Sequence, residues 1–128
     1  MKRDMELIRK ILFKIEEDYV GTALSNLSIE EFDRNTVAYH CKLLNEAGFI
    51  DDYKANYANG QIWRFTVGGL TWNGYDYLDK IRQDTIWNKT KEIITKKGLP
   101  MVIDVIKDVS TEVIKSMTEG AIKGFISQ

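Results

Sequence analysis

The 128-residue sequence contains a single cysteine and a single histidine, and these scarcities exclude two kinds of site. One cysteine, Cys41, cannot build an internal disulfide framework, and it is compatible with a reducing compartment. A zinc site needs about four ligands at characteristic spacing, and only His40 and Cys41 are present. We therefore expect no metal site. Cys41 is predicted to be a small core residue, and His40 a packed or capping histidine.

Long apolar runs and a basic surplus are also missing. The longest apolar stretch, Leu99 to Ile106, is interrupted by Asp104 and is too short to span a bilayer. The first ten residues, MKRDMELIRK, lack the apolar run of a signal peptide. We therefore expect a soluble cytoplasmic protein with no membrane partner. Lysine and arginine total 18 against 19 aspartate and glutamate, which counts against a nucleic-acid binder, since such proteins usually carry a basic excess.

Motifs of catalytic chemistry are absent from the sequence as well. There is no second histidine and no nucleophile elbow, and Gly68-Gly69 lacks the lysine and helix context of a phosphate loop. Asp76 and Asp79 are interpreted as solvated charges, because no perturbing environment surrounds them in the sequence. We expect a protein that is not an enzyme and that needs no cofactor.

The most informative feature that is present lies in residues 32–50, FDRNTVAYHCKLLNEAGFI. Asp33 is a good N-cap, because its carboxylate can accept free N–H groups of the first turn. Phe32 and Val37 have the spacing of a hydrophobic staple, and Gly48 stands where a left-handed residue ends a helix. The buried face is predicted to contain Val37, Cys41 and Leu44. This pattern is typical of the second half of a helix-turn-helix that leads into a β-wing.

Hydrophobic periodicity and turn residues predict the other elements. In chain order they are a helix over Arg3–Glu17, a short strand around Ala23–Leu27, the capped helix Arg34–Ala47, strands Phe49–Tyr53 and Ile62–Val67 around an Asn59-Gly60 turn, a helix capped by Thr71 and reaching Ile81, and helices Thr85–Lys97 and Pro100–Ser127. The predicted fold class is α+β: a winged helix (a helix-turn-helix with a β-wing hairpin) over residues 1–82, plus a C-terminal helical extension over residues 83–128.

Two resemblances favour this fold. The segment YHCKLLNEAGFI is similar to the recognition-helix end of arsenic-repressor-type winged helices, which commonly read HHLKLLREAGLV. A longer part of the chain resembles an uncharacterised bacterial and prophage family, a domain of unknown function of the DUF2513 type. The matching motifs are Arg3–Leu12 (RDMELIRKIL), Tyr39–Ile50, Leu70–Asp79 (LTWNGYDYLD) and Gln83–Glu92 (QDTIWNKTKE). Cys41 replaces a leucine of the family, and Tyr75 replaces a frequent histidine. The resemblance implies a winged-helix core and no established reaction.

Two functions are open for such a core. The first is that of a DNA-binding regulator of a bacterial or prophage locus, in which polar side chains read base edges and basic ones contact phosphates of double-stranded DNA. Ala38 is expected on the outward helix face, where it would permit close approach. The candidate DNA-binding residues are Asn35, Thr36, Tyr39, Lys42, Asn45, Lys54, Asn56, Asn59, Gln61 and Arg64.

The second function is that of a protein-binding winged-helix module of a phage or mobile element, which contacts and modulates a host protein. The aromatic residues Tyr53, Tyr57 and Trp63 of the predicted wing suit this function, because interfaces are enriched in aromatics. Asp51 and Asp52 at the base of the wing cancel its positive charge.

The last predicted helix has an apolar seam at three- and four-residue steps, longer than light contact with its own domain requires. A DNA regulator of this size usually needs two copies to span neighbouring half-sites. We therefore expect a homodimer through this helix. Its predicted interface residues are Val102, Ile106, Val109, Val113 and Met117.

Overall fold

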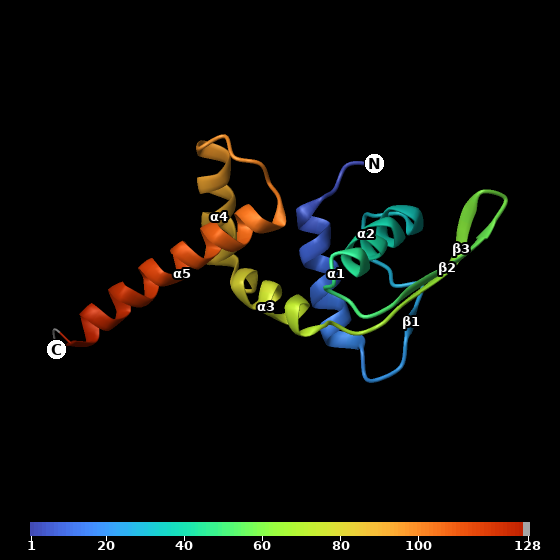
Figure 1. Cartoon of the computed structure of the whole chain (residues 1–128), viewed down its shortest axis with the longest axis horizontal. Helices are drawn as coiled ribbons and strands as arrows, with labels where there is room; N and C mark the ends of the chain where they lie inside the picture. The colour runs from blue at the N-terminus through green and yellow to red at the C-terminus, as the bar shows by residue number, and fades with distance from the viewer. Residues whose placement is uncertain (127–128) are drawn as a thin grey trace. The chain divides into compact units, whose positions relative to one another are not determined.

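The computed structural model of the chain describes residues 1–126, which form five helices and three strands (Figure 1). In chain order these are α1 (Met5–Asp18), β1 (Leu24–Ser25), α2 (Arg34–Glu46), β2 (Tyr53–Ala58), β3 (Gln61–Val67), α3 (Trp72–Ile81), α4 (Asp84–Lys96) and α5 (Ile103–Ile126). The chain divides into two compact units, Met1–Leu78 and a second unit that begins at Asp79, so the boundary falls inside α3. The predicted α+β class is confirmed.

Helix α1 begins at Met5 rather than at Arg3, because Asp4 caps it. The Asp4 carboxylate accepts the N–H of Glu6 at 3.0 Å and that of Leu7 at 3.1 Å. The fully buried side chains of the first unit include Leu7, Ile11, Leu12, Ile15, Leu44, Phe65 and Tyr77. Each large apolar side chain buried in this way contributes about 1.5–3 kcal/mol.

Helix α2 confirms the predicted cap, since the Thr36 N–H donates to the Asp33 carboxylate at 2.7 Å. Val37, Cys41 and Leu44 are buried as predicted. The prediction for Ala38 is wrong, because its side chain is fully buried. The physical reason is that α2 packs against α1 on one side and the hairpin on the other, which widens the buried face beyond a single stripe.

The segment that precedes α2 forms one turn and no regular helix. The N–H of Phe32 donates to the Ile29 carbonyl at 3.1 Å, and the intervening Glu31 has a positive φ of 75°. A helix cannot continue through such a residue, and α2 therefore starts afresh at its Asp33 cap.

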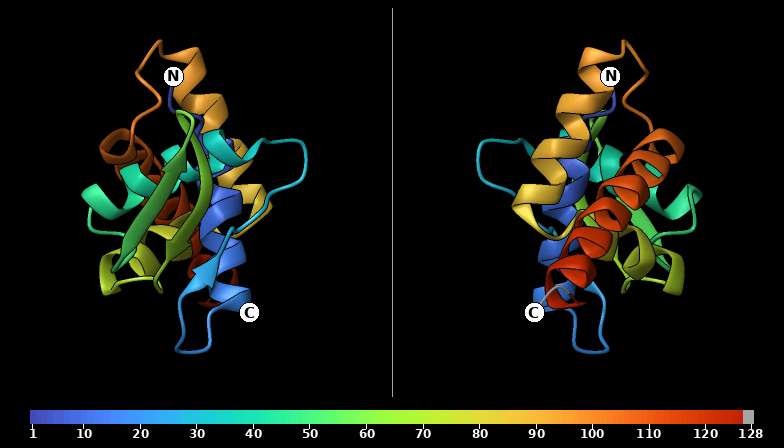
Figure 2. Two further views of the ribbon diagram at one scale, coloured as in Figure 1. Left: turned by 90° about the vertical axis from the view of Figure 1, so that its right-hand side faces the viewer. Right: turned by 90° about the vertical axis from the view of Figure 1, so that its left-hand side faces the viewer.

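Three antiparallel strands form one sheet in the order β1-β3-β2. Strands β2 and β3 are joined by Asn59 and Gly60, with φ of 54° and 76°. A two-residue hairpin turn of type I′ needs positive φ at both positions, so the predicted Asn-Gly turn is confirmed. The pairing shifts between Asn56, opposite Arg64, and Tyr57, opposite Ile62. Trp63 is therefore the extra residue of a β-bulge, in a hairpin that Figure 2 shows as a twisted ribbon.

The bounds of the predicted strand Phe49–Tyr53 are wrong, because β2 spans Tyr53–Ala58 and only an isolated bridge at Ile50 precedes it. The N–H groups of Gly48 and Phe49 donate to the carbonyls of Asn45 and Leu44 at 3.0 and 2.9 Å. These bonds are a Schellman motif that ends α2. Beyond it, Ile50 forms an antiparallel bridge with Leu70, and the Asp51 N–H donates to the Gly69 carbonyl at 3.0 Å. With a turn of only two residues, β2 then runs directly up to Ala58.

The predicted Thr71 cap of α3 is confirmed, since the Gly74 N–H donates to Thr71 Oγ1 at 3.1 Å. The Thr71 hydroxyl in turn donates to the Gly48 carbonyl, and its N–H donates to the Phe49 carbonyl at 3.0 Å. The ring of Tyr77 stacks on Phe49 at 5.3 Å between centroids. Helix α3 is thus anchored at the end of α2.

In the second unit, α4 and α5 pack against each other. Helix α4 ends in a Schellman motif at Gly98, which has φ of 65°, and the Leu99 N–H donates to the Ile94 carbonyl at 3.0 Å. The prediction that Pro100 starts the last helix is wrong, because α5 begins at Ile103. The first bond of α5 runs from the Ile106 N–H to the Val102 carbonyl at 2.9 Å, so the helix starts after Val102. The predicted helix end, Ser127, lies outside the described residues.

Candidate functional site

Helix α2 and the hairpin are joined at the β-bulge. Arg34 Nη1 donates to the Trp63 carbonyl at 3.0 Å, and the Ile62 N–H donates to Asn35 Oδ1 at 3.3 Å. A bulge disrupts the ladder and leaves backbone groups without strand partners. Two side chains from the first turn of α2 therefore supply partners to β3, and the helix and the hairpin form one continuous surface. A shallow polar depression of about 430 Å³ at this junction is lined by Asp33, Arg34, Asn35, Gln61 and Ile62.

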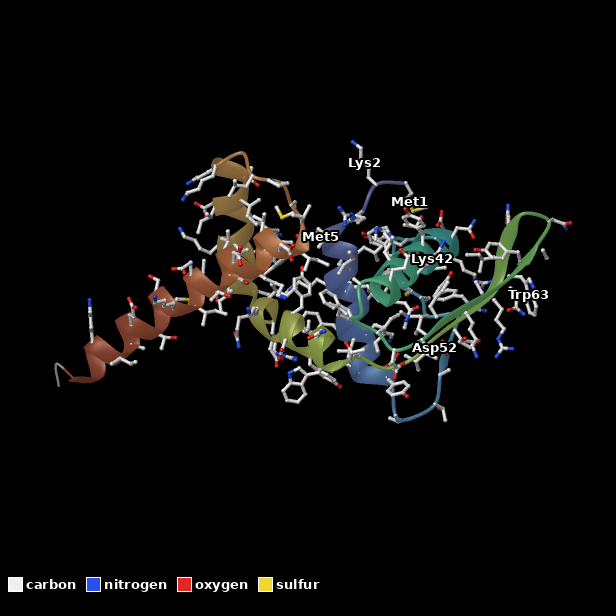
Figure 3. The ribbon with its side chains drawn as sticks, viewed as in Figure 1. Met1, Lys2, Met5, Lys42, Asp52 and Trp63 are labelled. Atoms are coloured by element: carbon white, nitrogen blue, oxygen red, sulfur yellow. The ribbon has the colours of Figure 1, made fainter. Side chains whose placement is uncertain are left out.

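The five candidate residues on α2 have different surroundings. Lys42 is exposed (Figure 3), whereas Thr36 and Tyr39 are half-buried. The side chain of Asn35 is bonded to the hairpin backbone as described above. Asn45 is half-buried, and its Nδ2 donates to the Ile50 carbonyl at 3.0 Å. Both asparagine side chains therefore hold neighbouring backbone in place, and Lys42 is the member of this group that is exposed and positively charged.

Strands β2 and β3 bring three hairpin candidates together on one face of the sheet. Asn56 lies opposite Arg64, and Lys54 lies opposite Thr66. Arg64 Nε donates to Ser25 Oγ at 3.1 Å, which ties this face to β1. These residues border a small depression of about 210 Å³. The sheet therefore presents two cations and an amide on a polar face.

The remaining candidates are dispersed. Gln61 lies beside Asn35 at the junction depression, whereas Asn59 occupies the exposed hairpin turn. The structure thus gathers Asn35 and Gln61 at the junction, and Lys54, Asn56 and Arg64 on the hairpin face. The other five candidates lie outside both groups: Thr36, Tyr39, Lys42, Asn45 and Asn59.

The net negative charge of the first unit disfavours binding to nucleic acid by electrostatic attraction alone. Residues 1–78 contain nine lysine and arginine residues and twelve aspartate and glutamate residues. A DNA-binding surface gains much of its affinity from phosphate neutralisation. Any DNA contact by this unit must therefore depend on a few local cations.

Exposed aromatic side chains lie on the hairpin and on α3. Tyr57 and Trp63 are 63% and 52% exposed, and Figure 3 shows Trp63 projecting from the hairpin. Tyr53, by contrast, is half-buried with its ring against Phe65 at 6.3 Å, so it belongs to the core face. Sequence reasoning missed Trp72, which is 82% exposed. Trp72 directly follows the Thr71 cap and precedes the buried pair Tyr77-Leu78. This position in the helix is the signal that could have predicted its exposure.

His40 confirms the prediction of a capping histidine. Its Nε2 accepts the Asp4 N–H at 2.9 Å, so Nδ1 carries the proton and donates to the Thr36 carbonyl at 2.8 Å. The ring joins the start of α1 to α2. Among residues 1–126, no group of three or more histidine, cysteine, aspartate or glutamate side chains is placed to hold a metal ion.

Cys41 is fully buried, which confirms its prediction as a core residue, and burial raises the pKa of its thiol to about 12. At pH 8 such a thiol is ionised to about one part in ten thousand, against about one part in ten for a thiol with the ordinary value of 9.0. We expect the folded protein to react with a thiol reagent about 1,000-fold more slowly than the urea-unfolded chain. Absorbance of the released chromophore measures both rates, and rapid labelling of the folded protein would contradict the burial of this side chain.

None of the helices in the described part of the chain is both long enough and apolar enough to cross a membrane. The fold and the junction define a mixed α+β protein with a helix-and-hairpin surface. Comparison with known sequences then gives its family. The chain matches the family described as "Hypothetical protein (DUF2513)" over residues 2–100, so it belongs to the DUF2513 family, as the resemblance implied.

A relative in Haemophilus influenzae, described as an uncharacterized protein, is 42% identical over 121 residues. The alignment covers 91% of this chain and 98% of that protein. No solved structure matches the chain. The family description names no reaction or ligand, and the functional argument therefore depends on the described surfaces.

Proposed function

We propose that this protein is a non-enzymatic DNA-binding regulator of a bacterial or prophage locus. In this proposal residues 1–82 are a winged-helix domain with α2 as the recognition helix and the β2–β3 hairpin as the wing. The observation that carries it is the junction at the bulge, where Arg34 and Asn35 hold the hairpin against α2. A reading helix and its wing must keep a fixed spacing to reach neighbouring grooves together, and this junction provides it.

Two features of the first unit support the same proposal. Helix α2 packs on both strands of the hairpin, β2 and β3. A single turn between Ile29 and Phe32 precedes α2, and in this proposal it would replace the first helix of a helix-turn-helix pair. The domain would therefore be a reduced winged helix in which a single turn sets the angle of the recognition helix.

The geometry assigns different roles to the candidate residues within this proposal. Lys42 on α2 and Lys54 and Arg64 on the hairpin face are the phosphate contacts, because they are exposed cations. Asn56 and Gln61 are exposed amides that can reach base edges. Asn35 and Asn45 act as positioning residues, since their side chains are bonded to the protein's own backbone.

The proposal is tested by the salt dependence of binding to duplex fragments of the native locus. Each phosphate contact contributes a slope of about −0.9 to the plot of log affinity against log salt. Replacing Lys42 and Arg64 together by alanine should reduce the slope by about two and weaken binding by about tenfold or more at low salt. Fluorescence anisotropy with labelled duplexes measures both quantities.

A matched double variant, Lys14→Ala with Lys115→Ala, removes the same charge from α1 and α5 and should leave the slope near the wild-type value. If low salt yields no complex with any fragment of the native locus, DNA binding is abandoned.

A second candidate function, that of a protein-binding module of a mobile element that contacts a host protein, is favoured by two observations. The first unit has an acidic excess, and Tyr57 and Trp63 are exposed at the bulged part of the hairpin. Aromatic side chains are enriched at interfaces and charged ones depleted at their centres. If DNA binding fails, a partner retained by the wild type and lost with Trp63→Ala would establish this function, provided that circular dichroism shows an unchanged fold.

A further inference from the structure

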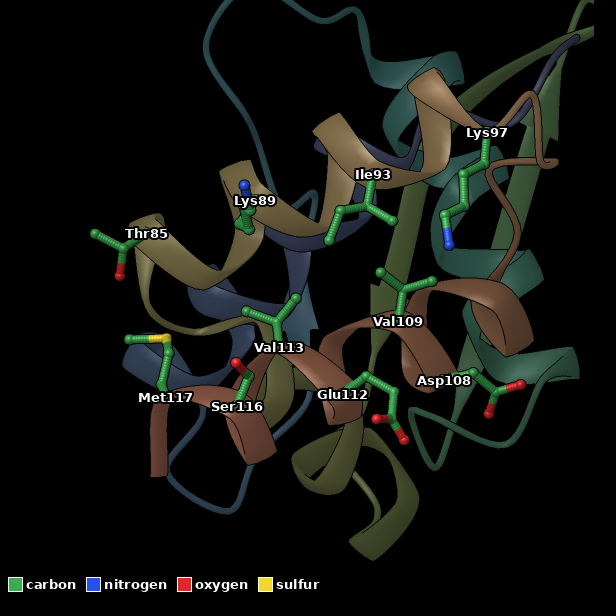
Figure 4. A pocket seen from close by; sticks show the side chains of 10 residues that line it. All are labelled: Thr85, Lys89, Ile93, Lys97, Asp108, Val109, Glu112, Val113, Ser116 and Met117. Atoms are coloured by element: carbon green, nitrogen blue, oxygen red, sulfur yellow. The ribbon is translucent and has the colours of Figure 1, made fainter. Parts of the chain in front are cut away.

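An open groove lies between α4 and α5 in the second unit (Figure 4). Its volume is about 650 Å³. Apolar side chains of Ile93 from α4 and of Val109 and Val113 from α5 face one another across it, as Figure 4 shows. On an ordinary protein surface the exposed apolar side chains are scattered, whereas here they line one groove. A contiguous apolar surface of this kind is typical of a binding site.

The two walls of the groove carry opposite charge. Lys89 and Lys97 stand on the α4 wall, and Asp108 and Glu112 stand on the α5 wall. No ion pair within the described part of the chain joins these walls to each other. A partner of one charge sign, such as a nucleic acid or a polyacidic peptide, would be repelled by one wall. A partner that carries both signs in reverse order is attracted by both.

A second copy of this chain has that arrangement. A two-fold axis places the same patch on both subunits, so that residue i of one contacts residue j of the other and the reverse. The basic α4 wall of each subunit then faces the acidic α5 wall of its partner. We propose that the α4–α5 groove is a self-complementary interface through which the protein forms a homodimer. This assembly does not depend on whether the first unit binds DNA or protein.

Only part of the predicted apolar seam of α5 is exposed enough to contact a second subunit. Ile106 and Val113 are buried within the chain itself, whereas Met117 is 52% exposed. A direct zipper of two α5 helices along the whole seam is therefore replaced by a contact that combines Val109 and Met117 of α5 with Ile93 of α4. From Lys115 to Gly124, α5 is exposed along its length, which extends the surface that a partner can cover.

The test uses charge reversal in the full chain, with sedimentation equilibrium as the measurement. The wild type should be a dimer at tens of micromolar. Variant one, Lys89→Glu with Lys97→Glu, has two acidic walls, and variant two, Asp108→Lys with Glu112→Lys, has two basic walls. Each alone should have a dimer dissociation constant raised by more than about tenfold, because like charges then face each other across the two-fold axis.

Mixing the two variants separates an interface from a folding defect. The acidic walls of variant one match the basic walls of variant two, so an equimolar mixture should form a heterodimer with near wild-type affinity. The control Lys2→Glu with Lys10→Glu changes the net charge equally on exposed residues of the first unit and should leave dimerisation unchanged. A monomeric wild type, reversal variants that dimerise like the wild type, or a mixture that stays monomeric would each overturn the proposal.

Discussion

Replacing Gly74 by alanine is expected to lower the free energy of unfolding by about 2–3 kcal/mol, although glycine is a poor helix former. Gly74 lies in the first turn of α3, and a Cβ atom built there falls well inside the contact distance of the Phe49 carbonyl oxygen. That oxygen already accepts the Thr71 N–H, so the backbone cannot move aside without losing the bond that anchors α3. The clash therefore outweighs the helix propensity gained, which is about 1 kcal/mol. Urea unfolding followed by circular dichroism measures the change.

Gly120→Ala is the matched control for this prediction. Gly120 is an exposed glycine inside α5, and a Cβ atom there meets nothing within 4 Å. The same substitution should therefore stabilise α5 by about 0.5–1 kcal/mol, through helix propensity alone. If the two variants changed stability in the same direction, the close approach of α3 to the end of α2 would not limit position 74.

The parts of the fold that sequence could predict are those set by neighbouring residues. The Asp33 and Thr71 caps, the Asn59-Gly60 turn and the buried stripe of α2 each depend on side chains within a few positions of one another. Local patterns of this kind are readable because their partners are adjacent in the chain. The same holds for the α+β class, since it requires only the types of the elements.

The wrong predictions concern residues that could either start a new element or end the preceding helix. Phe49 and Ile50 have the apolar character of a strand, but the N–H of Phe49 is engaged in ending α2. Pro100 suits a helix start, yet the Schellman motif at Gly98 and Leu99 ends α4 directly before it, and α5 begins only at Ile103. In each case the residues that end one helix determine where the next element begins. The hydrogen bonds of a helix terminus cannot be deduced from residue type alone.

The candidate site shows a different limit of sequence reasoning. Asn35 was predicted to face a ligand, and its exposure was the only property that the helical pattern could supply. Its bond to Ile62 joins residues 27 positions apart, and the bond of Arg34 to Trp63 spans 29. Both hydrogen bonds depend on a one-residue shift in strand pairing, which no local sequence motif predicts. The division of the candidates into positioning and exposed residues therefore required the structure.

Three weak acids of the first unit, the buried Cys41 and Tyr77 and the half-buried Tyr53, make its stability sensitive to alkali. Burial raises the pKa of Cys41 to about 12, and burial with the nearby Tyr57 and Cys41 raises the pKa of Tyr53 to about 12. Burial also raises the pKa of Tyr77, whose hydroxyl has no hydrogen-bond partner in the described residues. The folded protein keeps these protons at pH values where the unfolded chain releases them. Stability is therefore fully present below the unfolded values and is lost as pH rises toward the folded ones.

For Cys41 the loss should occur between about pH 9 and 12, where the unfolded thiol ionises and the folded one stays neutral. The free energy of unfolding should fall there by about 1.4 kcal/mol per pH unit from this group alone, or about 4 kcal/mol in all. Urea unfolding at intervals from pH 8 to pH 11 measures the slope. Cys41→Ala lowers stability at every pH, because it leaves a cavity, but it should flatten the slope by about 1.4 kcal/mol per unit above pH 9. An unchanged slope in this variant would show that the Cys41 thiol ionises alike in the folded and unfolded chains.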